Sequence, residues 1–136
     1  MAKKLTLAKL KEKVQKVFNK YIRLRDSGGG MFVCISCGEQ KSTDVCDAGH
    51  FWAKQGYDGL RFDEDNCHAE DSGCNRFDES HLIGYAINLK QKIGKQAFEA
   101  LNKRASDYKK NANFKWDRSD LEGMIKYYTQ KIKEVQ

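Results

Sequence analysis

The feature that most constrains this 136-residue sequence is the segment Cys34-Ile35-Ser36-Cys37-Gly38. Two thiolates separated by two residues on a tight turn can both reach one tetrahedral ion, and a glycine after the second cysteine relieves backbone crowding. A redox pair is the alternative interpretation, but it requires a thioredoxin-like strand–helix–strand context that the sequence lacks. We therefore predict a zinc knuckle here.

The other cysteines should complete this metal site. The chain has five cysteines, and this odd number argues against a set of disulfides. Cys74 is expected to be the third ligand. Asp71 stands three residues before it, where a second Cys-x-x-Cys pair would begin, so the fourth ligand is either Asp71 or Cys67, with Cys46 as an alternate. We expect about one structural Zn²⁺ per chain, because a small hairpin buries too little apolar area to be stable alone.

The net charge of +6 is unevenly distributed along the chain. Residues 1–26 carry nine basic and two acidic side chains, residues 39–79 carry four and eleven, and residues 80–136 carry twelve and six. Basic arms suit a polyanion such as nucleic acid, although they are also typical of solvated helix faces, and an acidic middle suits cations. The mean hydropathy of −0.78 and the absence of a long apolar run exclude a membrane span, and no secretory signal is visible, so we expect a cytoplasmic protein.

The first half of the chain predicts one helix and a small hairpin. Apolar residues recur at spacings of three and four over 5–25, which is typical of an amphipathic helix. Residues 31–35 are β-prone, and a second strand is expected near 43–46. Residues 50–73 show little periodicity and read as a long loop, which in a compact domain is usually functional.

The second half is predicted to be helical. One helix is expected from Cys74 to Ile93, ended by Gly94, and a shorter one over 95–104. The last helix begins after Asp117 or Ser119, with Glu122 completing a capping box after Ser119. We therefore predict an α+β fold in one domain, 1–136, made of a basic N-terminal helix (1–26), a metal-binding core (31–93) and C-terminal helices (95–136).

His50 follows the predicted second strand and is a candidate general base. In a one-metal nuclease, a neutral imidazole accepts a proton from water while a divalent ion polarises the phosphate and stabilises the leaving oxygen. A single histidine in a loop is more often only hydrogen-bonded, and an asparagine beside a cysteine is commonly a helix cap. The ordered combination of His50 with Asn66 and Asn75 is what favours catalysis.

Five segments, taken in order, resemble the lambdoid-phage NinG (Rap) recombination nuclease family. They are Cys34-x-x-Cys37-Gly38, Asp47-Ala48-Gly49-His50-Phe51, Leu60–Asn66, His68-Ala69-Glu70 and Cys74-Asn75-Arg76-Phe77, and Tyr21–Asp26 resembles the family too. That family is similar to HNH (His-Me finger) endonucleases. The resemblance implies a treble-clef, zinc-knuckle ββα-metal core and cleavage of branched DNA, such as Holliday junctions and D-loops, with catalytic Mg²⁺ or Mn²⁺.

The resemblance also implies a role for each catalytic candidate. His50 takes the general-base position, Asn66 orients that histidine or its loop, and Asn75 is a ligand of the catalytic ion. His81 is either a second ligand or a phosphate contact. The sequence departs from the pattern at Asp71, which replaces a zinc cysteine, and at Gly49, where many HNH enzymes have a metal-binding side chain that Asp47 could replace.

DNA is the expected partner, and basic residues near the site and on the first helix are the expected contacts. They are Arg23, Arg25, Lys54, Arg61 and Arg76, with Lys9, Lys13, Lys16 and Lys20 on the first helix. The apolar faces of the first and last helices would form either a homodimer interface or part of the core. Two other functions remain open at this stage, a non-catalytic zinc-knuckle DNA-binding module and an adaptor whose acidic middle binds a basic partner.

Overall fold

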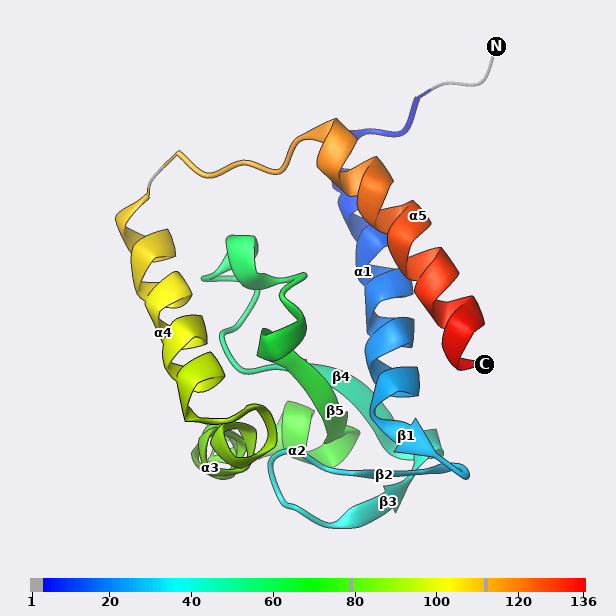
Figure 1. Cartoon of the computed structure of the whole chain (residues 1–136), viewed down its shortest axis with the longest axis vertical. Helices are drawn as coiled ribbons and strands as arrows, with labels where there is room; N and C mark the ends of the chain where they lie inside the picture. Colours follow the sequence, from blue (N-terminus) through cyan, green and yellow to red (C-terminus); the bar gives the residue numbers. More distant parts are fainter. Residues whose placement is uncertain (1–3, 79, 112) are drawn as a thin grey trace.

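The computed structural model describes residues 4–78, 80–111 and 113–136. The helices are α1 (Leu7–Arg25), α2 (Ser72–Phe77), α3 (His81–Ile93), α4 (Lys95–Lys110) and α5 (Arg118–Val135), and the strands are β1 (Ser27–Gly28), β2 (Met31–Val33), β3 (Gln40–Ser42), β4 (Cys46–His50) and β5 (Cys67–Asp71). The predicted mixture of helices and small antiparallel sheets is therefore confirmed (Figure 1). None of the helices in the described residues is long and apolar enough to cross a membrane.

The first and last helices pack against each other along one side of the molecule (Figure 1). Thr6 begins α1 by accepting a hydrogen bond from the Lys9 backbone at 3.2 Å. The apolar stripe of α1 meets that of α5, and Phe18 contacts Tyr128 edge to face with ring centroids 5.1 Å apart. These two apolar faces therefore form a core within one chain, which leaves the lysine-rich face of α1 toward solvent.

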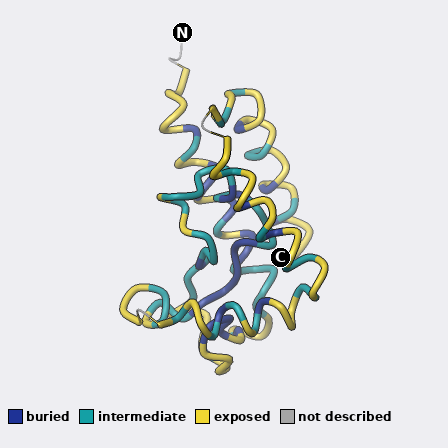
Figure 2. The backbone as a smooth tube through the Cα atoms, turned by 90° about the vertical axis from the view of Figure 1, so that its left-hand side faces the viewer, coloured by how far each residue is buried: buried dark blue, intermediate teal, exposed yellow. Residues whose placement is uncertain are grey.

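Two separate antiparallel sheets lie beside this helix pair. One has the order β1-β2-β3, and the other pairs β4 with β5 from Cys46↔Asp71 to His50↔Cys67. The first four residues of β5, Cys67 to Glu70, are all buried, and Figure 2 shows a buried stretch of chain running through the middle of the molecule. The β5 strand was expected to be part of a long loop, which is wrong, because a strand covered on both faces does not show the apolar–polar alternation that identifies a half-buried strand.

Three predicted boundaries also need correction, and the structure decides between the two caps proposed for the last helix. The second strand of the knuckle hairpin is β3, whereas Thr43–Val45 forms one turn of 3₁₀ helix. The helix expected over 74–93 is broken between α2 and α3, where the Asp78 carboxylate accepts hydrogen bonds from Ser80 at 2.9 and 2.7 Å and competes with helical pairing. Asp117, not Ser119, caps α5 by accepting from the Asp120 backbone at 2.8 Å. The helix expected over 95–104 extends to Lys110.

A second core attaches α3 and α4 to the knuckle. Tyr85 and Leu89 of α3 and Leu101 of α4 are fully buried, and they pack with Ile35 of the knuckle. The closest approach is at Gly84, where an added Cβ would overlap the Ser36 carbonyl oxygen. This packing places the start of α3 beside the β4–β5 hairpin.

Candidate functional site

Three cysteines from two elements converge on one point. The sulfur atoms of Cys34, Cys37 and Cys74 lie within 4.8 Å of one another, so the cluster could hold a metal ion such as zinc. The Cys34 sulfur also accepts the Asp71 backbone N–H at 3.2 Å and lies 3.3 Å from the Ser36 hydroxyl. Burial would raise the pKa of the Cys34 thiol, but hydrogen bonds from the Cys37 backbone and the Ser36 side chain outweigh it and lower that pKa. Burial raises the pKa of the other two thiols, that of Cys74 to about 12, so Cys34 is the cysteine of the cluster whose thiolate is favoured without an ion.

The two residues predicted as a fourth ligand lie outside this cluster. The Asp71 carboxylate caps α2 by accepting the Gly73 N–H at 3.0 Å and lies 3.6 Å from the Lys41 ammonium. Cys67 is buried in the α1–α5 core, where burial raises the pKa of its thiol. The alternate, Cys46, also has its pKa raised by burial, to about 11. The structure thus brings together three of the six candidate metal ligands.

The imidazole of His50 is fixed at the end of β4. Its Nε2 lies 2.9 Å from the Arg61 carbonyl oxygen, which can only accept a hydrogen bond. The proton of the neutral ring therefore resides on Nε2, and Nδ1 is left as an unprotonated acceptor. Burial lowers the pKa of His50, assisted by the charges of Lys54 and Arg61, so the neutral form is favoured. His50 thus has the protonation state of a general base.

Asn66 holds the loop that follows His50. Its side chain is fully buried and donates to the carbonyl oxygens of Trp52 and Leu60 at 3.0 and 3.1 Å. Its Oδ1 accepts the Trp52 N–H at 2.8 Å. All of these partners belong to the chain after β4, so Asn66 orients the loop that leads to Arg61, the hydrogen-bond partner of His50.

A cavity of about 350 Å³ brings three of the predicted catalytic residues together. It is lined by His50, Asn75 and His81, with Lys54 from the loop and Asn19 from α1. Asn75 donates from Nδ2 to the Asp47 carboxylate at 3.0 Å, and this bond leaves its Oδ1 available. Asn66 acts from behind the loop and does not line the cavity.

A buried carboxylate that the sequence analysis did not select lies behind His81. Glu70 is fully buried on β5, and its Oε2 lies 2.7 Å from His81 Nδ1. Its position opposite Asp47 follows from the β4–β5 register, so recognising β5 as a strand would have found it. Burial raises the pKa of Glu70, opposed by the hydrogen bond and charge of His81.

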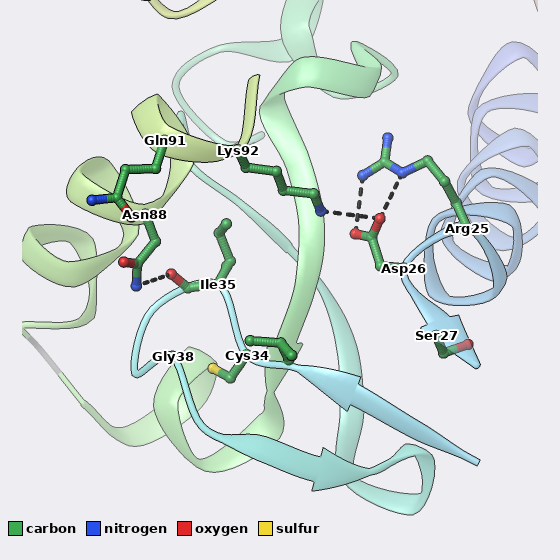
Figure 3. Close-up of a pocket in the computed structure, with 10 residues that line it drawn as sticks. Arg25, Asp26, Ser27, Cys34, Ile35, Gly38, Asn88, Gln91 and Lys92 are labelled. Carbon is green, nitrogen blue, oxygen red and sulfur yellow. Dashed lines mark hydrogen bonds and ion pairs between the residues drawn. The ribbon is translucent and has the colours of Figure 1, made fainter. Parts of the chain in front are cut away.

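The predicted DNA-contacting residues differ in their surroundings. Arg25 is engaged inside the fold: it pairs with Asp26 at 2.8 Å and donates to the carbonyl oxygens of Glu64 and Cys67. Figure 3 shows this cluster, in which Lys92 also reaches Asp26 at 3.0 Å, at one end of a cavity of about 680 Å³. Arg25 therefore holds the end of α1 onto β5 rather than projecting to solvent.

The other four predicted DNA-contacting residues are Arg23, Lys54, Arg61 and Arg76. Arg61 is largely buried and pairs with Asp58 at 3.2 Å, and Arg76 is exposed but forms two hydrogen bonds with Asp47. Lys54 lines the cavity with His50, and Arg23 lines a groove beside the glycine turn after α1.

Comparison with known proteins identifies the family of this chain. The family model described as the bacteriophage lambda NinG protein matches residues 2–136. The chain belongs to the phage NinG family. It is 32% identical over 124 residues to protein ninG of Salmonella phage P22, and 28% identical over 124 residues to protein ninG of Escherichia phage lambda. The resemblance of the sequence motifs to the NinG family is thereby confirmed.

This NinG-family chain matches only part of those relatives. The alignments to the P22 and lambda proteins cover 91% of this chain but 56% of each relative, so the chain spans about half the length of the curated relatives it matches. No solved structure matches the chain.

Proposed function

We propose that this NinG-family chain is a metal-dependent endonuclease that cleaves branched DNA. The observation that carries the proposal is the state of His50, whose Nε2 is hydrogen-bonded to a carbonyl oxygen and whose pKa is lowered by burial. Such an imidazole accepts a proton from water through Nδ1 at neutral pH. The arrangement of the β4–β5 hairpin followed by α2 supports the ββα-metal core that the HNH resemblance implies.

The residues around the cavity fit a divalent cation. Asn75 Oδ1 is available because Nδ2 is held by Asp47, and amide oxygens are suitable ligands for Mg²⁺ or Mn²⁺. When bound, the ion would polarise the phosphodiester and stabilise the leaving oxygen. His50 takes the proton of the attacking water, Asn66 keeps the His50 loop in place, and Lys54 faces the phosphate from the cavity wall.

The solvent face of α1 is the proposed path for the DNA backbone. Lys16 and Arg23 lie three residues before and four residues after Asn19, so they share its helix face, and Asn19 lines the cavity. Lys9, Lys13, Lys16 and Lys20 are exposed, and none of them forms an ion pair within the described part of the chain. Lys13, Lys16 and Lys20 line a groove between α1 and α5, and Lys16 and Arg23 extend this positive charge toward Asn19 at the cavity.

A cleavage assay on a branched substrate with Mg²⁺ or Mn²⁺ tests the proposal. We expect His50→Ala to lower the cleavage rate by a factor of about 10²–10⁴, the usual contribution of a positioned general base, with zinc content and DNA affinity unchanged. We expect Asn75→Ala to raise the metal concentration required for cleavage. If folded His50→Ala cleaves at the wild-type rate, the chain is better described as a non-catalytic DNA-binding module.

DNA binding is tested separately by its salt dependence. Replacing Lys13, Lys16 and Lys20 together by Gln should weaken binding and reduce the slope of log K against log[salt] by about 1 for each of these lysines that binds a phosphate. The matched control replaces the exposed Lys95, Lys103 and Lys110 of α4, on the far side of the molecule from α1 (Figure 1), and should leave the slope unchanged. Equal effects of the two triple variants would contradict the proposed path.

A further inference from the structure

Glu70 makes a contact that no catalytic role assigned so far explains. It is fully buried, its Oε2 lies 2.7 Å from His81 Nδ1, and its Oε1 has no hydrogen-bond partner among the residues the structure describes. A buried carboxylate is costly to the fold unless it is paired, so its retention needs a reason. The carboxylate stands between the β5 backbone and a residue that lines the cavity.

The contact fixes the orientation of the His81 ring. A carboxylate oxygen accepts the proton of Nδ1, so Nε2 is the ring nitrogen left for a ligand, and it has no hydrogen-bond partner in the described part of the chain. A histidine that binds a metal almost always donates its other ring N–H to a carboxylate or carbonyl, which sets the tautomer and raises the basicity of the ligand nitrogen. Glu70 and His81 have this relationship.

The Glu70 carboxylate fits only because position 49 is a glycine. A Cβ built on Gly49 would overlap Glu70 Oε1, so a side chain at position 49 and the Glu70 carboxylate exclude each other. Gly49 immediately precedes His50, and its carbonyl oxygen accepts a hydrogen bond from Tyr85 at 2.6 Å. The Glu70 carboxylate of the neighbouring strand β5 therefore occupies the space that a side chain at position 49 would fill.

The register of the β4–β5 hairpin places two carboxylates side by side next to the cavity. Asp47 and Glu70 face each other across β4 and β5, and each holds one residue of the cavity wall. Asp47 binds Asn75 Nδ2 and leaves Oδ1, while Glu70 binds His81 Nδ1 and leaves Nε2. The two carboxylates thus leave Asn75 Oδ1 and His81 Nε2, on two residues that line the same cavity, available to a ligand.

We infer that His81 is a ligand of the catalytic cation through Nε2 and that Glu70 is the positioning residue that orients it. This inference rests on the proposed function and specifies its metal site. An imidazole ligand favours Mn²⁺ and later first-row divalent ions over Mg²⁺, which prefers oxygen ligands. The site therefore selects a transition-metal ion, with Asn75 Oδ1 as the accompanying oxygen ligand.

The test measures Mn²⁺ binding directly, independent of cleavage. The zinc-loaded chain is titrated with Mn²⁺, with and without a short branched DNA that is checked to be intact at the end of each titration, and free Mn²⁺ is read by electron paramagnetic resonance. We expect His81→Ala to raise the Mn²⁺ dissociation constant by about 10–100-fold, and Glu70→Gln, whose amide oxygen can still accept from Nδ1 but carries no charge, to raise it by about tenfold. The control Glu64→Gln removes a carboxylate that also accepts a side-chain hydrogen bond, from Tyr128, and should leave Mn²⁺ affinity unchanged.

A double variant separates positioning from a general structural role. If Glu70 acts through His81, adding Glu70→Gln to His81→Ala causes no further loss of Mn²⁺ affinity. A further loss of about tenfold or more would mean that Glu70 supports the fold instead, which overturns the inference. If Glu70→Gln fails to retain zinc and a native fold, Glu70→Asp, which keeps the charge but shortens the reach to Nδ1, carries the same test.

Other outcomes also decide the matter. The inference is overturned if both single variants bind Mn²⁺ as tightly as the wild type, or if the wild type binds no Mn²⁺ with or without DNA. If His81→Ala binds DNA more weakly at unchanged Mn²⁺ affinity, His81 is a phosphate contact instead. Mn²⁺ binding that depends on both residues without any cleavage of branched DNA would remove the proposed function and leave this metal site standing.

Discussion

Replacing Asp26 by Asn is expected to remove a measurable part of the stability of the fold. The Asp26 side chain is only 6% exposed and forms ion pairs with Arg25 and Lys92 (Figure 3). It also accepts a hydrogen bond from the Ala69 backbone N–H. Burial by itself would raise the pKa of this carboxyl, but the hydrogen bond and charge of Arg25, together with Lys92, lower it from 3.8 to about 2. The cluster thus stabilises the ionised form in the folded state.

This difference in pKa sets the size and the pH range of the effect. It corresponds to about 2 kcal/mol at neutral pH, because each pKa unit is worth about 1.36 kcal/mol. Since the folded pKa is lowered, the contribution is complete well above pH 3.8 and is lost as the pH falls toward 2. At about pH 3 roughly 1 kcal/mol should remain.

Urea unfolding measures the effect, with wild type and variant compared at each pH in the same metal state, because protonation of the cysteines at low pH releases zinc. At about pH 7 the urea midpoint of Asp26→Asn should fall by about 1–2 M relative to wild type, and the difference should shrink on acidification to about pH 3. Asp107→Asn, which removes an exposed carboxylate paired with Lys103, is the matched control and should leave the midpoint unchanged. An unchanged midpoint for Asp26→Asn at neutral pH, or a difference that persists in full on acidification, would show that the ionised Asp26 carboxylate does not stabilise the fold.

Three further predictions concern packing, metal and pH. Gly84→Ala should destabilise the fold by about 1–3 kcal/mol in thermal melts, because the added Cβ would overlap the Ser36 carbonyl oxygen. Gly123→Ala in α5 is the control: its Cβ would meet nothing within 4 Å, so it should stabilise the fold by about 1 kcal/mol. Cys37→Ser should lower the zinc content below one ion per chain by elemental analysis, and full zinc retention would remove Cys37 from the site. The cleavage rate should rise with pH through an apparent pKa below 6.5, because burial lowers the pKa of His50; a midpoint above 6.5 would exclude His50 as the base.

The parts of the molecule that local patterns determine were predictable. The apolar stripe that ends at Ile22 defines α1 because a helix repeats about every 3.6 residues, and the knuckle spacing brings Cys34 and Cys37 together regardless of the rest of the fold. The third cysteine, Cys74, was predicted correctly as a member of the cluster, and it lies in the first turn of α2.

The parts that depend on pairing between distant segments were not predictable from those patterns. β5 carries His68 and Glu70 on a covered face, and such buried polar residues give no hydrophobic signal. Its register against β4 decides that Glu70 lies beside Asp47 and Gly49, which no spacing rule reveals. The same holds for Arg25, whose charge suggests a DNA contact until Asp26 and β5 are seen to surround it.

The packing of α1 against α5 has a consequence for synthesis of the protein on the ribosome. Almost the whole described chain separates these two helices, so the nascent α1 emerges long before its partner exists. Until α5 is translated, Val14 and Phe18 lack the partner residues Leu121 and Tyr128. The metal cluster needs only residues up to Cys74, so it can assemble earlier, while completion of the first core waits for the last helix. Chains stalled before residue 118 should therefore hold zinc yet aggregate through α1.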